Sequence, residues 1–212
     1  MTGILRKNQA EYFHGRDWVH QVGFYAPDWR AFVENHNRLF GSGPFFHTVN
    51  TFGKLLYHGE EVDCAGLEFR AAYGAWGAHS IEVVEQSDLS VPTMFTEIND
   101  TSKPGFNHLH MFVESLEEAQ DACDFLAIPV ITVGYPDLEN ALEKARTTGA
   151  DEALVRANAG KPSFMVCDMR KEVGYCIQFI EPRAKNLHDA IVRAREKWDG
   201  SAETLLISMG GN

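Results

Sequence analysis

Four side chains able to bind a metal ion lie at widely spaced positions in this 212-residue chain, each within a largely apolar run. They are His20, Glu82, His108 and Gln178. Imidazole nitrogens and carboxylate or amide oxygens suit a divalent transition metal. A charged Glu82 inside the run IEVVE is costly to bury unless it is paired or ligated. If the strands that carry these residues curve into a cup, the four side chains can meet at one ion.

The positions of these residues favour a shared site more than their types do. A single His in a strand is usually a structural residue, and a single Glu or Gln usually faces solvent. The four residues, however, fall at equivalent places, in the first and last strands of each half of the chain. Because side chains alternate along a strand, His20 is expected to share a face with Val22 and Phe24, and His108 to share one with His110.

The elements expected around these residues repeat in the two halves of the chain. Each half is expected to begin with a strand, continue with a helix and close with about three strands. The spacing predicts helices over 29–40, 116–126 and 185–198, and three strands in EALVRAN, PSFMVCDMR and GYCIQFIEP. This repeat divides the chain into four expected segments. They are an N-terminal arm over 1–16, a first module over 17–98, a second module over 105–183 with an insertion near 115–136, and a C-terminal helix and tail over 184–212.

The sequence resembles the vicinal oxygen chelate superfamily, which includes glyoxalases, methylmalonyl-CoA epimerases, extradiol dioxygenases and bleomycin-resistance proteins. The segments that carry the resemblance are HQVGFYAPD, LFGSGPFF, HSIEVVEQ, NHLHMFVES and FMVCDMRKEVGYCIQFIEP. The resemblance implies an α+β fold in which tandem βαβββ modules form a curved mixed sheet around a metal cup. It also implies that His20, Glu82, His108 and Gln178 are the ligands of one divalent ion, which could be Zn, Fe, Mn, Co or Ni.

The resemblance implies a glyoxalase-like isomerase, epimerase or lyase that acts on a small substrate with two neighbouring oxygens. In this sequence the last ligand position holds Gln178, where the superfamily usually has Glu. An amide cannot take a proton at neutral pH, so Glu82 and His110 are the expected catalytic bases.

Two other functions stay open at this point. His20, His108 and Glu82 supply the two imidazoles and one carboxylate of an Fe(II) ring-cleaving dioxygenase, although dioxygenases of this superfamily carry the carboxylate where Gln178 stands. A non-enzymatic protein that binds a small molecule is the other alternative. The aromatic residues that could line its pocket are Phe45, Phe46, Phe52, Tyr57, Phe69, Tyr73 and Trp76.

The composition and charge of the chain limit the kinds of binding partner that are expected. The net charge is −11 and no basic stripe is visible, so nucleic acid is not expected as a partner. Since no apolar run is long enough for a signal peptide or a membrane helix, a cytoplasmic protein without a membrane partner is expected. The four cysteines form no CxxC pair and are expected to be reduced. Modules of this fold pair within one chain or between two chains, so a homodimer remains open.

Overall fold

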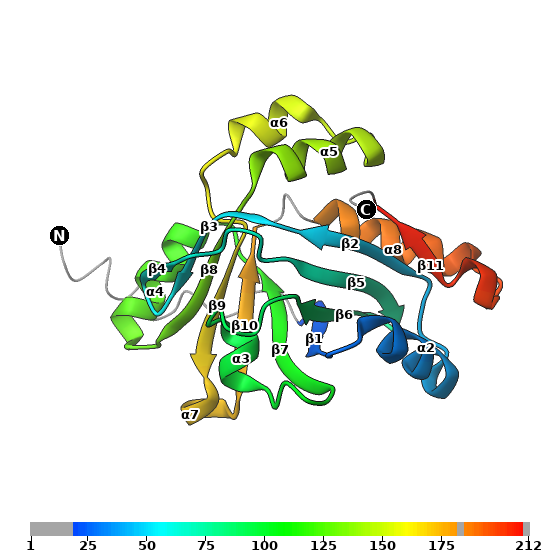
Figure 1. The fold of residues 1–212 in the computed structure, drawn as a ribbon, viewed down its shortest axis with the longest axis horizontal. Coiled ribbons are helices and arrows are strands. Elements are labelled where there is room, and N and C mark those ends of the chain that lie inside the picture. Colours follow the sequence, from blue (N-terminus) through cyan, green and yellow to red (C-terminus); the bar gives the residue numbers. More distant parts are fainter. Residues whose placement is uncertain (1–18, 182–184, 210–212) are drawn as a thin grey trace.

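The computed structural model describes residues 19–181 and 185–209, which form one mixed sheet of eleven strands with helices around it (Figure 1). The predicted arm over 1–16 and the start of the first module at residue 17 lie outside the described residues. No helix among the described residues is long and apolar enough to cross a membrane.

Two modules with the same strand order make up the centre of the sheet. In the first, the order is β2-β5-β6-β1, and in the second it is β8-β9-β10-β7. The first module contains β1 (Gln21–Tyr25), α2 (Trp29–Phe40), β2 (Phe45–Asn50), β5 (Phe69–Trp76) and β6 (His79–Gln86). The second contains β7 (Gly105–Phe112), α4 (Leu116–Leu126), β8 (Val130–Pro136), β9 (Phe164–Met169) and β10 (Tyr175–Ile180). The predicted tandem βαβββ fold is therefore confirmed.

The first strands of the two modules join them at the middle of the sheet. β1 runs antiparallel to β7 and parallel to β6, while β10 runs parallel to β7. The strands β6, β1, β7 and β10 are thus consecutive neighbours, and they carry the polar side chains described below.

One chain segment connects the outer edges of the two modules. β2 pairs with β5 at the edge of the first module, and β3 (Phe52–Tyr57) pairs with β8 at the edge of the second. Only Thr51 separates β2 from β3, so the sheet must curve until its two edges approach each other. The strand order still ends in β11 (Leu206–Ser208) and β4 (Glu60–Val62), so hydrogen bonds do not close the ring of described strands.

The core lies on both sides of this curved sheet. Inside the curve, Tyr25, Leu55, Phe69, Phe95 and other apolar side chains form one buried cluster. Outside it, α4 packs on β9 and β10, and α2 packs on β5 and β6. The α2 helix begins after Asp28, whose Oδ1 accepts a hydrogen bond from the Ala31 amide, and ends at Gly41 in the left-handed conformation (φ 63°), as its sequence predicts.

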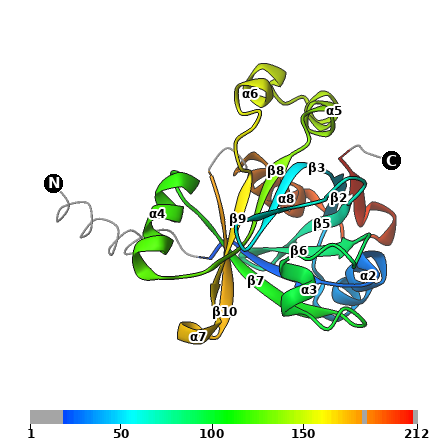
Figure 2. The same ribbon diagram turned by 60° about the vertical axis from the view of Figure 1, so that its left-hand side comes forward.

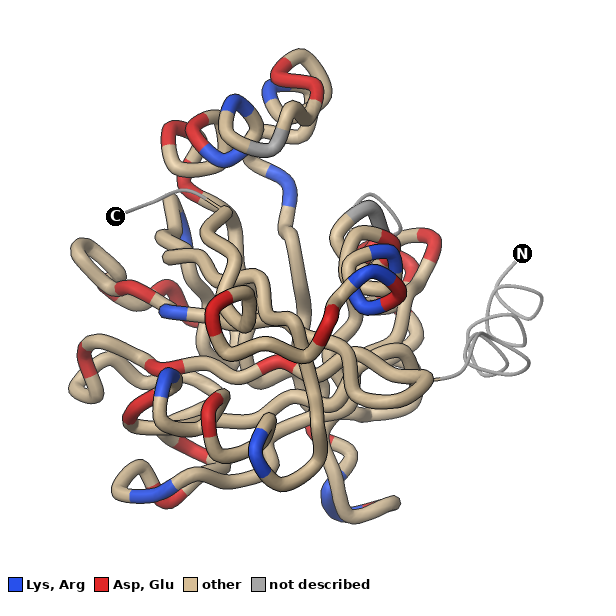
Figure 3. The backbone as a smooth tube through the Cα atoms, turned by 90° about the vertical axis from the view of Figure 1, so that its right-hand side faces the viewer, with Lys and Arg blue, Asp and Glu red and all other residues tan. Residues whose placement is uncertain are grey.

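The second module carries an insertion between β8 and β9, not near 115–136 as predicted. Residues 116–136 form α4 and β8, which belong to the module itself. The additional residues form α5 (Leu138–Thr148) and α6 (Glu152–Ala157), which lie together at one end of the molecule in Figures 1 and 2. Figure 3 shows charged residues of both signs along this helical pair, whereas the central strands carry few.

The segment EALVRAN was predicted to be a strand, and this prediction is wrong because the segment forms α6. Asp151 caps the helix by accepting a hydrogen bond from the Ala153 amide, and Ala, Leu and Arg are strong helix formers. The remaining helices are α3 (Met94–Ile98), α7 (Arg170–Val173), the predicted C-terminal helix α8 (Lys185–Lys197) and the 3₁₀ turn η2 (Ala202–Thr204).

Candidate metal site and substrate pocket

A cavity of about 470 Å³ opens on the concave side of the sheet. Its polar wall comes from the central strands, and its apolar wall comes from the inner core and the surrounding helices. The polar residues of the central strands that line it are Gln21, Ser80, Glu82, His110 and Gln178. Helices α5, α6 and α8 and the β2–β3 segment contribute residues to the opposite side. The cavity thus meets the volume expected of a small-molecule site.

Glu82 and His108 meet beside this cavity. Oε2 of Glu82 lies 3.2 Å from Nε2 of His108. The His108 ring is fully buried, and Glu82 is 6% exposed. Neither of these two atoms has a hydrogen-bond partner.

The side chain of Asn107 decides which nitrogen of His108 carries the proton. Nδ2 of Asn107 faces Oδ1 of Asn99 at 2.6 Å and the carbonyl oxygen of Met94 at 3.4 Å, and both of these oxygens only accept. The Asn107 oxygen is therefore the atom that lies 2.8 Å from Nδ1 of His108, and it accepts from that nitrogen. In the neutral ring, Nε2 then presents its lone pair to the Glu82 carboxylate.

The backbone of β1 provides the space for this contact. Gly23 pairs with Glu82 on one neighbouring strand and with His108 on the other. A Cβ at residue 23 would overlap the His108 ring. The absence of a side chain at Gly23 therefore allows the imidazole to lean across β1 toward the carboxylate.

His110 and Gln178 are neighbours on β7 and β10 and face the same cavity. Nδ1 of His110 lies 2.9 Å from Oε1 of Gln21, and an amide oxygen there accepts from Nδ1–H. Burial lowers the pKa of His110 to about 3, and the nearby His108, His20 and His188 add to this shift. The ring is therefore neutral at pH 7, and its Nε2 has no hydrogen-bond partner, like Oε1 of Gln178.

The donor atoms of Glu82, His108 and Gln178 fit a divalent cation. Glu82, His108, His110 and Gln178 each leave one buried oxygen or nitrogen atom without a hydrogen bond, and all four atoms are of types that bind metals. Two ligands about 2.1 Å from an ion are about 3.0 Å apart in octahedral geometry and about 3.4 Å apart in tetrahedral geometry. The 3.2 Å between Glu82 and His108 lies between these values.

His20 itself does not line the cavity, but its ring lies beside Phe112 and His188, which do. β1 begins at Gln21, and the inner face of this strand carries Gln21, Gly23 and Tyr25. The His20 ring is buried 4.8 Å from the ring of Phe112 and 5.4 Å from that of His188. Within the described residues, no three His, Cys, Asp or Glu side chains are close enough to hold one ion. The structure brings Glu82 and His108 together, and a ligand role for His20 stays a prediction.

A series of polar side chains extends from Glu82 to α5, one of the two inserted helices. Tyr73 pairs with Glu82 across β5 and β6, and burial followed by the charge of Glu82 raises the pKa of Tyr73 well above its usual value. The Tyr73 hydroxyl accepts a hydrogen bond from Nδ2 of Asn50 at 3.4 Å. Oδ1 of Asn50 in turn accepts one from Nζ of Lys144 in α5 at 2.7 Å. All these residues line the cavity.

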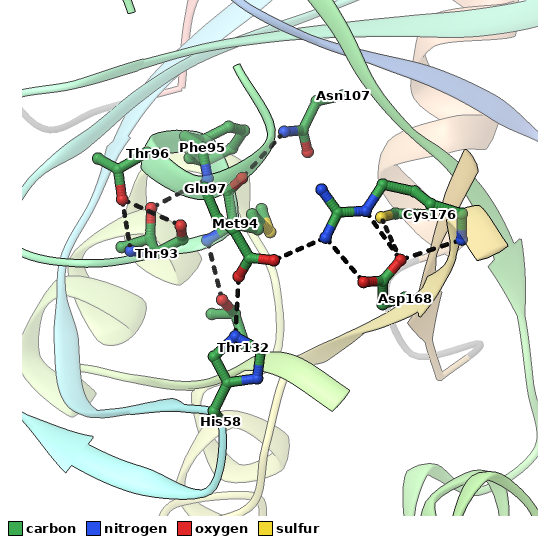
Figure 4. A network of polar contacts seen from close by, with 11 residues as sticks. His58, Thr93, Met94, Phe95, Thr96, Glu97, Asn107, Thr132, Asp168 and Cys176 are labelled. Atoms are coloured by element: carbon green, nitrogen blue, oxygen red, sulfur yellow. Dashed lines mark hydrogen bonds and ion pairs between the residues drawn. The ribbon is translucent and has the colours of Figure 1, made fainter. Parts of the chain in front are cut away.

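A separate ionic network fixes α3, which orients Asn107. Figure 4 shows Glu97 facing His58, with 2.8 Å between Oε2 and Nε2. Its other oxygen accepts from Arg170 at 2.6 Å, and Arg170 also binds Asp168 through two further nitrogen–oxygen contacts of 2.7 and 2.8 Å. These bonds hold α3 against β9 and α7.

The sequence did not identify several of these residues. Gln21, Gly23, Asn50, Asn107 and Lys144 carry no motif of their own, although the pairing of Asn107 with a neighbouring His offered a weak signal. Of the aromatic residues expected to line a pocket, Phe52, Phe69 and Tyr73 do so. Phe45 and Trp76 pack in the outer core instead.

The strand order is that of the vicinal oxygen chelate fold, as the resemblance implied. The structure is similar to methylmalonyl-CoA epimerase from Mycobacterium tuberculosis, with 13% identity, a TM-score of 0.44, and coverage of 80% of this chain and 90% of that one. A hypothetical protein from Bacillus halodurans C-125 is similar at 12% identity and a TM-score of 0.43, over 77% of this chain and 93% of that one.

A methylmalonyl-CoA epimerase variant from Streptomyces coelicolor, in complex with 2-nitronate-propionyl-CoA, is similar at 10% identity and a TM-score of 0.43, over 77% of this chain and 95% of that one. No protein-family model matches the sequence, and no curated protein matches it.

Proposed function

We propose that the protein is a divalent-metal-dependent isomerase, epimerase or lyase of the vicinal oxygen chelate superfamily. Its substrate is a small molecule with two neighbouring oxygens. The observation that carries the proposal is the approach of Glu82 Oε2 to the lone pair of His108 Nε2. Two buried electron-rich atoms 3.2 Å apart repel each other unless a cation, either a proton or a metal ion, lies with them. A metal ion is such a cation, and it is the one that the site's other open atoms also suit.

Glu82 and His108 would hold the ion, together with Gln178. Glu82 supplies the single carboxylate, and the amide of Gln178 adds no charge. When bound, a divalent ion polarises the oxygens of a chelating substrate and so lowers the pKa of the adjacent C–H bond. Asn107 keeps the lone pair of His108 directed to the site, as the outer partners of metal-bound histidines generally do.

His110 is the proposed base for proton transfer. Its Nδ1 is held by Gln21, so the lone pair of Nε2 faces the cavity. Glu82 is the alternative base, although its Oε2 is directed at His108. The Tyr73 hydroxyl remains protonated and can donate a proton or a hydrogen bond beside Glu82. General-base assistance of this kind contributes about 10²–10⁴-fold to a rate.

Metal titration and proton exchange test this proposal together. The wild-type protein, freed of metal with a chelator, is titrated with Co²⁺, Mn²⁺, Ni²⁺ and Zn²⁺ by calorimetry. Loaded protein is then incubated in D₂O with a panel of 2-oxo and 2-hydroxy acids, and deuterium incorporation is followed by NMR. We expect His108→Ala to lose metal binding, and His110→Ala to retain the metal but lose exchange. A wild-type protein that binds none of these ions would refute the proposal.

Non-catalytic binding of a small molecule is the second candidate, because the cavity is lined largely by apolar side chains. Phe52, Phe69, Phe112 and Phe164 are among them. Tight ligand binding by metal-free protein, with no deuterium exchange in the loaded protein, would favour this candidate over the enzyme.

A further inference from the structure

We infer that Lys144 and Asn50 form an anion-binding subsite at the end of the cavity opposite Glu82, so that the substrate carries a carboxylate distant from its two metal-binding oxygens. This inference rests on the proposed function, whose substrate class it narrows. Lys144 lies on α5, in the insertion that lengthens the second module.

The charge distribution in the cavity supports an anion at this end. Among the lining residues that the structure describes, Lys144 is the one Lys or Arg and Glu82 is the one acid. An anionic group is repelled from Glu82 and attracted to Lys144. The two charges therefore orient a molecule that has a chelating end and an anionic end.

Burial of the Lys144 ammonium group strengthens its electrostatic interaction with a bound anion. Desolvation lowers the pKa of Lys144 to about 8, against a weaker opposite effect of Glu143. The group remains mostly charged at pH 7. A charge in a partly desolvated position interacts with a bound carboxylate more strongly than a surface lysine does.

Asn50 sets the direction of this lysine and links it to the rest of the site. Its Oδ1 holds Nζ at 2.7 Å, and its Nδ2 donates to the Tyr73 hydroxyl at 3.4 Å. Since Tyr73 stands opposite Glu82 on the neighbouring strand, a continuous row of polar groups runs along the cavity between its two ends. The remaining walls are mainly apolar, which suits a short hydrocarbon chain between the carboxylate and the chelating oxygens.

The competing explanation is that Lys144 only fastens α5 to β2. Asn140 of the same helix already bonds the carbonyl oxygen of Val49 at 3.3 Å, so α5 has a neutral connection to β2 as well. A purely structural lysine would affect stability without discriminating between charged and uncharged ligands. Ligand charge is therefore the variable that separates the two explanations.

The experiment compares Lys144→Met with Lys144→Arg, and uses Arg146→Met as the control for charge. Arg146 is on the same helix, where it pairs with Glu152 outside the cavity. Each Co²⁺-loaded protein is titrated by calorimetry with 2-oxo dicarboxylates of increasing length and with their monoesters at the distal carboxylate. We expect the wild type and Arg146→Met to prefer one dicarboxylate over its ester by about tenfold or more, Lys144→Arg to retain part of this preference, and Lys144→Met to lose it.

Failure of the proposed metal-dependent function can be distinguished from failure of the anion-binding subsite. If Co²⁺ does not bind, the metal-dependent activity is refuted, and the subsite is then tested in metal-free protein. There, ¹³C NMR of dimethylated Lys144 is followed during titration with glutarate and with its monomethyl ester, and a shift only with glutarate supports the subsite. A wild type that never discriminates acid from ester, or a preference that survives in Lys144→Met, would overturn the inference.

Discussion

The imidazole of His108 lies on the backbone of Gly23, in the space that a side chain at that position would occupy. Gly23 belongs to the strand between those of Glu82 and His108 and pairs with both residues. The distance between the two proposed ligands therefore depends on a residue that contributes no side chain.

Replacing Gly23 by Ala should move His108 away from Glu82. We expect metal affinity to fall by at least about tenfold, as when a ligand loses its support. Overpacking should also cost about 1–3 kcal/mol of stability. Calorimetric metal titration and urea unfolding measure the two effects. Gly53→Ala is the matched control, since the nearest atom to its Cβ would be 3.4 Å away. Equal metal affinity in both variants would contradict the role of Gly23.

Replacing Asn107 by Ala should remove the acceptor that keeps the His108 proton on Nδ1. We expect about 10–100-fold weaker metal binding with the fold retained. Long-range ¹H–¹⁵N NMR spectra of the imidazole report the tautomer directly. In the wild type the proton should reside on Nδ1, whereas the variant should show a mixture. An unchanged tautomer would mean that Asn107 does not select it.

Gln178→Glu should have opposite effects on the metal-free and metal-bound protein. A second buried carboxylate in the cavity wall lacks a partner without metal, so the free energy of unfolding should fall by about 1–3 kcal/mol. With a divalent ion present, the added charge should strengthen binding by about tenfold. Thermal unfolding with and without Co²⁺ tests both signs. Gln178→Ala serves as the control that should weaken metal binding instead.

The Asp168–Arg170 pair should make stability depend on pH in the acidic range. Hydrogen bonds from Arg170 lower the pKa of Asp168 to about 2, below the value of about 3.9 in an unfolded chain. The contribution of this pair is therefore complete above about pH 5 and is lost as the pH falls toward 2. Because Arg170 is 36% exposed, Asp168→Asn should cost on the order of 1 kcal/mol at pH 7.

Urea unfolding at pH 7, 4 and 2 tests this expectation, since the difference between wild type and Asp168→Asn should shrink at each step. Glu172, an exposed acid on α7, provides the control as Glu172→Gln. A constant difference across this range would show that the cost of Asp168→Asn does not arise from ionisation.

The sequence predicted the fold well because element order depends on local patterns that repeat in both halves. It did not identify Gln21, the neighbour of His20, as a residue that lines the cavity, because nothing local in the sequence indicates which face this side chain takes. The pair Glu82–His108 was within reach of sequence analysis because both side chains are polar groups in apolar strands. Gly23 and Lys144 were not, because their roles depend on which strand or helix lies opposite.

The passage of β2 into β3 has a consequence for the integrity of the chain. Residues 45–57 supply an outer strand to the first module and, after Thr51, another to the second. Neither half possesses a complete set of pairings when it is alone. The chain therefore cannot be divided into two complete modules at its apparent midpoint. A cut in the linker before β7 would leave β3 in one fragment without its partner strand, and β8 in the other fragment as an edge strand without β3. The internal duplication of the sequence does not make two autonomous folding units.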